Sequence, residues 1–244
     1  MAFVQVRFFS EALGKQTECF VLLPEAPIPK PWHVMFLLHG HSDDHSIWQR
    51  RTSIERYVEG LPLVVVMPDA AKSFYCDGVQ GPAYNRAIAY ELPDLVERWF
   101  SPGGEWCASG LSMGGYGAFR IALERPELFK SAVSHSGAVG FAHQLEYFAE
   151  NRNSEEFRRI VGDARTGGPN DLFELVKATS PLPSLRFDCG TEDFLLQDNR
   201  LFRDYLVESG IPHEYEEFPG SHNWAYWDLH VQDAIAFHRK NLGF

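Results

Sequence analysis

The chain has 244 residues, 45% of them hydrophobic and 23% charged, so it can bury a core as one globular domain. Its formal net charge of −11 makes nucleic acid and anionic membranes poor partners. The four cysteines form no CxxC pair, the first residues lack the pattern of an export signal, and no apolar run approaches the ~20 residues of a membrane helix, so we expect a cytoplasmic protein.

Predicted strands and helices alternate along most of the chain. In chain order they are strands near 3–9 and 17–23, a strand at 33–38, a helix over 47–59, a strand at 62–67, a helix over 84–100 with a kink or break at Pro93, a strand at 106–109, a helix over 115–123, a strand at 131–134, a strand at 184–189, a helix over 195–209, a strand at 213–218 and a helix over 224–239. The runs 33–38 and 62–67 are typical of strands buried on both faces of a parallel sheet. The alternation predicts an α/β fold with a mostly parallel central sheet and helices on both faces.

Residues 140–180 interrupt this alternation. They are polar and show three helical patterns, at 144–150, 154–161 and 171–177. About 40 residues can hardly bury a core of their own, so we interpret them as a small helical insertion over the site within a single domain spanning 1–244. Gly167 and Gly168 would allow this insertion to move.

Ser112 is the candidate nucleophile because the pentapeptide Gly110–Gly114 lies between the predicted strand at 106–109 and the predicted helix at 115–123. A serine on such a turn is held in a strained conformation, with its hydroxyl above the sheet. The small flanking glycines avoid clashes at the turn. This context favours a nucleophilic serine over an ordinary turn.

His222 is the candidate general base. A serine hydroxyl needs a positioned base, and that base should follow a late strand at the same edge of the sheet. His222 follows the predicted strand at 213–218, whereas His213 lies at the wrong end of that strand. His230 and His238 fall within the last predicted helix, where packing or surface roles are more common.

The orienting acid should lie between the serine and the histidine in chain order, in the loop after the preceding strand. Asp193 follows the Gly190 turn and is best placed to reach the histidine. Asp188, still within the strand with its side chain near loop backbone, and Glu192 are the alternatives. Asp193 can also be interpreted as the cap of the helix that begins near Leu195.

Two backbone N–H groups should stabilise the tetrahedral intermediate. One is the amide of Met113, directly after the nucleophile. The other is expected from the loop after the strand at 33–38, where Gly40 lets the chain bend so that the amide of His41 faces the site. Among the aromatic residues, Trp48 and Tyr75 are the first candidates for lining the substrate pocket, followed by Trp224.

Four segments together resemble the esterase D-like "putative esterase" branch of the α/β-hydrolases: LHGHSDDHSIW at 38–48, GLSMGGYGA at 110–118, DCGTEDFL at 188–195 and GSHNW at 220–224. The chain is most similar to small bacterial tributyrin and acetyl esterases. The resemblance implies a Ser112–His222–Asp193 triad, oxyanion donors at His41 and Met113, and hydrolysis of short-chain acyl esters without a cofactor or metal. His41 departs from the smaller or apolar residue that relatives often carry.

Several alternatives remain open. The same triad serves acyltransferases and thioesterases such as S-formylglutathione hydrolases, and a carrier that has lost its chemistry would keep the fold. The residues His39, His41, Asp43 and His45 nearly form the HxHxDH box of a metallohydrolase, but the final histidine is displaced by one position. The expected partner is a small ester, and the sequence leaves both a monomer and a homo-oligomer open.

Overall fold

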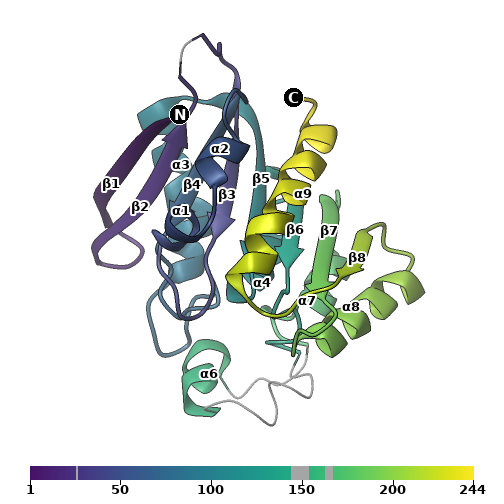
Figure 1. The fold of residues 1–244 in the computed structure, drawn as a ribbon. Helices are drawn as coiled ribbons and strands as arrows, with labels where there is room; N and C mark the ends of the chain where they lie inside the picture. The colour runs from purple at the N-terminus through teal and green to yellow at the C-terminus, as the bar shows by residue number, and fades with distance from the viewer. Residues whose placement is uncertain (26, 144–153, 163–166) are drawn as a thin grey trace.

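The computed structural model describes residues 1–25, 27–143, 154–162 and 167–244, which form an eight-stranded sheet with helices on both faces (Figure 1). The strands are β1 (Ala2–Ser10), β2 (Lys15–Leu23), β3 (Trp32–Leu38), β4 (Leu63–Pro68), β5 (Gly103–Leu111), β6 (Phe129–His135), β7 (Ser184–Gly190) and β8 (Glu214–Phe218). All eight were predicted within a few residues of these bounds.

The sheet is mostly parallel, as predicted. Its strands lie in the order β1-β2-β4-β3-β5-β6-β7-β8. β2 pairs antiparallel with both β1 and β4, and each remaining pair is parallel. The carboxyl ends of the parallel strands therefore share one edge of the sheet, and the loops that follow β3, β5, β7 and β8 meet there.

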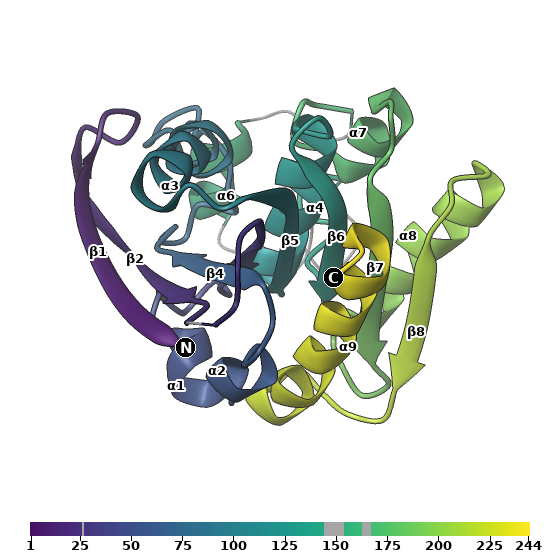
Figure 2. The same cartoon turned by 90° about the horizontal axis from the view of Figure 1, so that it is seen from above.

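Helices cover the two faces of the sheet unequally (Figure 2). They are α1 (Ile47–Arg51), α2 (Ile54–Tyr57), the π-helix η1 (Arg86–Glu91), α3 (Leu92–Phe100), α4 (Met113–Glu124), α6 (Ser154–Val161), α7 (Leu172–Ala178), α8 (Leu196–Glu208) and α9 (Trp224–Leu242). One core cluster joins η1, α3, α4, α7 and α8 to the sheet, and a second joins α1, α2 and α9 to the opposite face. Phe36 and Met35 of β3 belong to the first and second cluster respectively, as expected for a strand buried on both faces.

The helix predicted over 47–59 is divided into α1 and α2. Thr52 is extended, with φ −132° and ψ 172°, and its hydroxyl accepts a hydrogen bond from the Ile54 N–H at 3.2 Å. The Ser53 N–H donates to the Asp228 carboxylate of α9 at 2.9 Å. The N–H groups of Ser53 and Ile54 thus bind side-chain oxygens. These hydrogen bonds replace the backbone bonds that one continuous helix would need.

The other helical predictions agree well with the structure. The segment 84–100 contains η1 and α3, which follow each other directly, and Pro93 lies at the junction where the π-helix ends and the α-helix begins. Within the insertion, the patterns at 154–161 and 171–177 correspond to α6 and α7, whereas that at 144–150 lies outside the described residues. Among the helices described, none combines the length and apolar character needed to cross a membrane.

His238 joins α9 to the sheet. Its Nε2 lies 2.8 Å from the Ser109 hydroxyl and its Nδ1 lies 2.7 Å from the Ser131 hydroxyl. Burial lowers the pKa of His238 from 6.5 to about 3, and nearby His135 adds to this effect. Below pH 6.5 the unfolded chain therefore takes up a proton here that the folded protein excludes, so stability is lost as the pH falls from 6.5 toward 3.

This titration can be measured with His238→Gln, which keeps a side chain able to hydrogen bond but does not titrate. Between pH 7 and pH 5, protonation of unfolded His238 should lower the free energy of unfolding of the wild type by about 2 kcal/mol. Urea unfolding at both pH values should show a loss smaller by that amount in the variant. Equal losses in the two proteins would contradict a neutral buried His238.

Candidate active site

Ser112 lies on the turn between β5 and α4 with φ 52° and ψ −117°, which is a strained backbone conformation. A Cβ on Gly110 would lie 2.2 Å from the Gly114 carbonyl oxygen, and one on Gly114 would lie 2.3 Å from the Leu38 carbonyl oxygen. The glycines are therefore required by close backbone contact. The Ser112 N–H donates to the His135 carbonyl of β6 at 2.9 Å, which anchors the turn.

Three side chains from different loops converge at this turn. The Ser112 hydroxyl lies 3.0 Å from His222 Nε2, and His222 Nδ1 lies 2.8 Å from the Asp193 Oδ2 atom. Asp193 is 6% exposed, so water competes little for its carboxylate. The carboxylate can accept the Nδ1 proton, which leaves Nε2 unprotonated and able to accept the serine proton.

The loops that carry Asp193 and His222 are hydrogen-bonded and packed against each other. The Glu192 N–H donates to the Gly220 carbonyl at 2.9 Å, and a Cβ on Gly190 would lie 2.3 Å from that same oxygen. Asp193 Oδ1 also accepts the Leu195 N–H at 2.8 Å. Asp193 therefore contacts both His222 and the Leu195 N–H, whereas the N-cap position of α8 is Leu195 and not Asp193.

The alternative acids have other partners. Asp188 lies in β7, as expected, but its carboxylate accepts the Tyr226 hydroxyl at 2.9 Å and lies 2.8 Å from His135 Nδ1. The expectation that it binds loop backbone is therefore wrong, because side chains from β6 and α9 are packed against it. Glu192 lies 3.2 Å from the Thr191 hydroxyl and is exposed.

The loop after β3 lies beside the nucleophile. A Cβ on Gly40 would lie 2.7 Å from Leu111 Cδ1, 3.0 Å from Asp43 Oδ2 and 3.9 Å from Ser112 Cβ. A larger residue here would have to displace the ends of the Leu111 and Asp43 side chains, so the loop backbone lies close to the nucleophile turn. Met113 is the first residue of α4, and the N–H groups of a first helical turn have no partner within the helix. The two proposed donors therefore belong to the Gly40 loop and to the start of α4, and both segments lie next to Ser112 in the structure.

The histidine-rich segment after β3 does not form a metal box. His39 Nε2 accepts the Ala70 N–H at 3.0 Å, His41 Nε2 lies 3.0 Å from Glu156 Oε1, and His45 Nε2 lies 3.7 Å from Glu18 Oε1. Each imidazole thus contacts a different element. Within the described ranges no three His, Cys, Asp or Glu side chains are grouped to hold a metal ion.

Two predicted pocket residues belong to the core instead. Trp48 is 1% exposed and Tyr75 is 0% exposed, so neither lines an open pocket. Trp224 is half-buried and packs edge-on against Trp48, with ring centroids 5.3 Å apart. The aromatic residue that sequence reasoning missed is Phe194, which is 48% exposed and lies 4.4 Å from the His222 ring. The sequence does place Phe194 directly after Asp193, and this position could have marked it as a residue near the site.

A cavity of about 350 Å³ lies between the loop 71–84 and α6. The Val79 and Gln80 N–H groups donate to the carbonyls of Ile160 and Arg159, which holds this loop against the end of α6. Glu156 lines the cavity and contacts His41. The insertion therefore contacts the predicted oxyanion loop directly.

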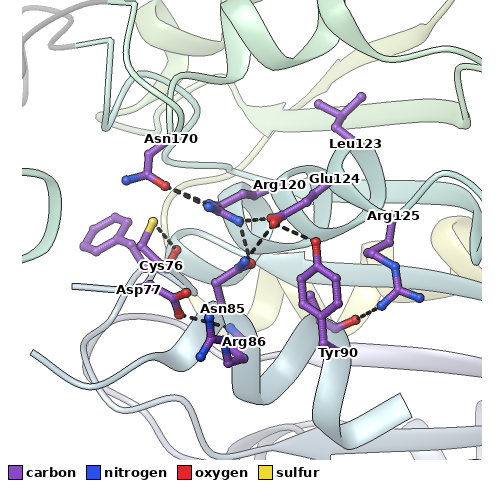
Figure 3. Close-up of polar contacts among 12 residues, drawn as sticks. Cys76, Asp77, Asn85, Arg86, Tyr90, Arg120, Leu123, Glu124, Arg125 and Asn170 are labelled. Carbon is purple, nitrogen blue, oxygen red and sulfur yellow. Dashed lines mark hydrogen bonds and ion pairs between the residues drawn. The ribbon is translucent and has the colours of Figure 1, made fainter. Parts of the chain in front are cut away.

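Arg120 of α4 connects the nucleophile helix to this region (Figure 3). Its guanidinium donates to Asn85 Oδ1 at 2.5 Å and to Asn170 Oδ1 at 2.8 and 3.1 Å, and it pairs with Glu124. Tyr90 of η1 also donates to Glu124, at 2.9 Å. The Arg120 side chain is nearly buried, and the Glu124 carboxylate and the two amide oxygens compensate its charge. It thereby fixes the start of η1 and the segment before α7 to α4.

Comparisons with known proteins found esterases and serine hydrolases. The sequence model of the family described as "Putative esterase" matches residues 10–238. An acetyl esterase of Caldicellulosiruptor saccharolyticus is 27% identical, with 98% of this chain and 99% of that protein covered. Among solved structures, the fluorophosphonate-binding serine hydrolase FphF of Staphylococcus aureus is 32% identical with a TM-score of 0.87, and 97% of each chain is covered. The S-formylglutathione hydrolase FrmB of the same organism is 32% identical with a TM-score of 0.84, covering 97% of this chain and 98% of that one.

Proposed function

The chain belongs to the "Putative esterase" family of serine hydrolases, and on this premise we propose that it hydrolyses short-chain carboxylic esters through an acyl-enzyme on Ser112. The observation that carries the proposal is the series of contacts from the Ser112 hydroxyl to His222 at 3.0 Å and from His222 to Asp193 at 2.8 Å. A strained serine, a buried carboxylate and an imidazole between them are the parts that acyl transfer requires.

In the first half of the proposed reaction, Ser112 Oγ attacks the ester carbonyl carbon while His222 Nε2 takes the hydroxyl proton. The tetrahedral intermediate collapses, His222 returns that proton to the departing alkoxide, and the acyl group stays on Ser112. Water then attacks the acyl-enzyme with His222 as base. The carboxylic acid leaves, and Ser112 regains its proton. Throughout the reaction the Asp193 carboxylate accepts a hydrogen bond from the Nδ1–H group of His222, and it stabilises the transient imidazolium.

The negative charge on the former carbonyl oxygen needs donors that are already in place. We assign this role to the backbone amides of His41 and Met113, one from each side of Ser112. Each such donor contributes roughly 3 kcal/mol in the transition state. No metal or cofactor enters this mechanism.

The proposal of short acyl groups is supported by the similarity to an acetyl esterase, which covers nearly the whole of both chains. With p-nitrophenyl esters from acetate to octanoate, we expect kcat/KM to be highest at two to four carbons and roughly tenfold or more lower at eight. A maximum at octanoate would contradict this substrate class, and Ser112→Ala provides the background rate.

Thioester hydrolysis is the second candidate, favoured by the 32% identity to FrmB of S. aureus, which is an S-formylglutathione hydrolase. The same acyl-enzyme chemistry would serve it. Adding S-formylglutathione to the ester panel separates the two: a kcat/KM far above that of every oxygen ester would favour the thioester.

We further propose that the protein works in the cytoplasm on small esters. All four cysteines, Cys19, Cys76, Cys107 and Cys189, are free and buried, as suits a reducing compartment. The net charge of −11 supports a small-molecule substrate over nucleic acid or an anionic membrane.

A further inference from the structure

Three consecutive carbonyls, one at the end of β3 and two in the predicted oxyanion loop that follows it, each accept a hydrogen bond from a buried side chain. Trp48 Nε1 donates to the Leu38 carbonyl at 3.0 Å, and the Tyr75 hydroxyl donates to the His39 carbonyl at 3.0 Å. His39 Nδ1 lies 2.7 Å from the Gly40 carbonyl. All three side chains are at most 1% exposed, so water does not compete with them.

The surroundings of His39 and Tyr75 show that both side chains donate their hydrogen bonds to these carbonyls. His39 Nε2 accepts the Ala70 N–H, so the proton of the neutral ring is on Nδ1, facing the Gly40 carbonyl. Burial lowers the pKa of His39, which keeps the ring neutral. Burial also raises the pKa of Tyr75 well above 10, so its hydroxyl stays protonated and donates.

Fixing the Gly40 carbonyl also fixes the amide that follows it. The Gly40–His41 peptide is trans, because the cis peptides of the described residues are Lys30–Pro31 and Ser180–Pro181. In a planar trans peptide the C=O and N–H groups point in opposite directions. Since the Gly40 carbonyl points at His39 Nδ1 and at the Asp43 N–H, the His41 N–H is directed away from both.

The segment Phe74–Tyr75 contacts both sides of the nucleophile. Phe74 and Tyr75 have φ values of 51° and 55°, which is costly for residues with large side chains. The Phe74 N–H lies 3.4 Å from the Met113 sulfur, while the Tyr75 hydroxyl binds the His39 carbonyl. The Tyr75 ring also lies against α4, because a Cβ on Gly117 would be 2.2 Å from it.

We propose that Tyr75, together with Trp48 and His39, is a positioning residue that sets the separation of the two oxyanion donors, the amides of His41 and Met113. This inference rests on the proposed esterase function. The strained backbone at 74–75 is what allows one short segment to contact the His39 carbonyl and the Met113 side chain together. Strain of this kind persists where the surrounding contacts hold it, and it is common beside active sites.

The test is Tyr75→Phe, which removes one hydroxyl and keeps the ring on α4. With p-nitrophenyl acetate we expect kcat to fall ~10- to 100-fold, since small displacements of transition-state donors have effects of this size. KM should change less than about threefold, because the amides act on the oxyanion and not on the ground-state ester. Trp48→Phe, which deletes the hydrogen bond to the Leu38 carbonyl, should reproduce this split between kcat and KM.

The inhibition constant (Ki) of a trifluoromethyl ketone provides a second measurement, which a general loss of protein stability would not change. Addition of Ser112 to the ketone creates a hemiketal oxyanion, so its Ki should rise in Tyr75→Phe by the same factor by which kcat/KM falls. The pH profile of kcat/KM should be unchanged, because His222 and Asp193 are untouched. All rates are divided by the concentration of active sites titrated with a fluorophosphonate.

The matched control is Tyr205→Phe, whose hydroxyl donates to the Phe173 carbonyl at 2.6 Å away from the nucleophile. It should leave kcat and Ki as in the wild type. A Tyr75→Phe protein with kcat and Ki within twofold of the wild type, or with a lower Tm as its only change, overturns the positioning role. A wild-type protein that neither hydrolyses the ester nor binds the ketone overturns the esterase proposal itself.

Discussion

Replacing Ser112 by alanine should lower kcat for p-nitrophenyl acetate by ~10⁶ and abolish labelling by a fluorophosphonate. The reason is that the hydroxyl 3.0 Å from His222 Nε2 is the atom that would form the acyl-enzyme, and alanine offers nothing in its place. The residual rate would come from the oxyanion donors and substrate binding alone. Steady-state kinetics and gel-based labelling measure both effects.

The fold should survive this substitution, because Ser112 makes its anchoring contacts through backbone atoms. Its N–H and carbonyl bind His135 and Ala138, and alanine preserves both bonds. The Tm should therefore stay within a few degrees of the wild type. Ser209→Ala, at the end of α8, is the control and should label normally. Labelling of Ser112→Ala at the wild-type rate would place the nucleophile elsewhere.

Much of the fold was predictable because buried parallel strands have a strong sequence pattern. The apolar runs of β3 and β4 are buried on both faces, and apolar residues must fill every position of such strands. The division of the helix at Thr52 was not predictable. It depends in part on Asp228, 175 positions beyond Ser53, and a local sequence pattern contains no information about so distant an acceptor.

The candidate site was likewise predictable in part. Ser112, Asp193 and His222 come in the chain order that successive strand ends impose, so topology alone brings them near one edge. Trp48 and Tyr75 were assigned to the pocket because they lie in loops after strands, but both side chains are directed at backbone carbonyls of the oxyanion loop. Tyr75 has a φ of 55°, and a large side chain gives no sequence signal for such a backbone conformation.

The second large effect is expected from Asp193→Asn, which should lower kcat by ~10⁴ with little change in the fold. Asparagine keeps an oxygen for the Leu195 N–H, so the start of α8 remains stabilised. Its amide donor can instead face His222 Nδ1, which moves the imidazole proton to Nε2. Nε2 then points a proton at the Ser112 hydroxyl and cannot act as base. The measurement is kcat at a pH where the wild type is fully active, with circular dichroism to verify the fold.

The variants Glu192→Gln and Asp188→Asn test whether Asp193, and not a neighbouring acid, orients His222. Glu192 is the exposed neighbour and its amide variant should hydrolyse esters at the wild-type rate. Asp188 is buried against His135 and Tyr226, so Asp188→Asn should lower the Tm and affect kcat much less than Asp193→Asn. If Asp188→Asn lost ~10⁴ in kcat at an unchanged Tm while Asp193→Asn stayed within tenfold of the wild type, the acid would be Asp188. The 2.8 Å contact from Asp193 to His222 and the side-chain partners of Asp188 support the opposite result.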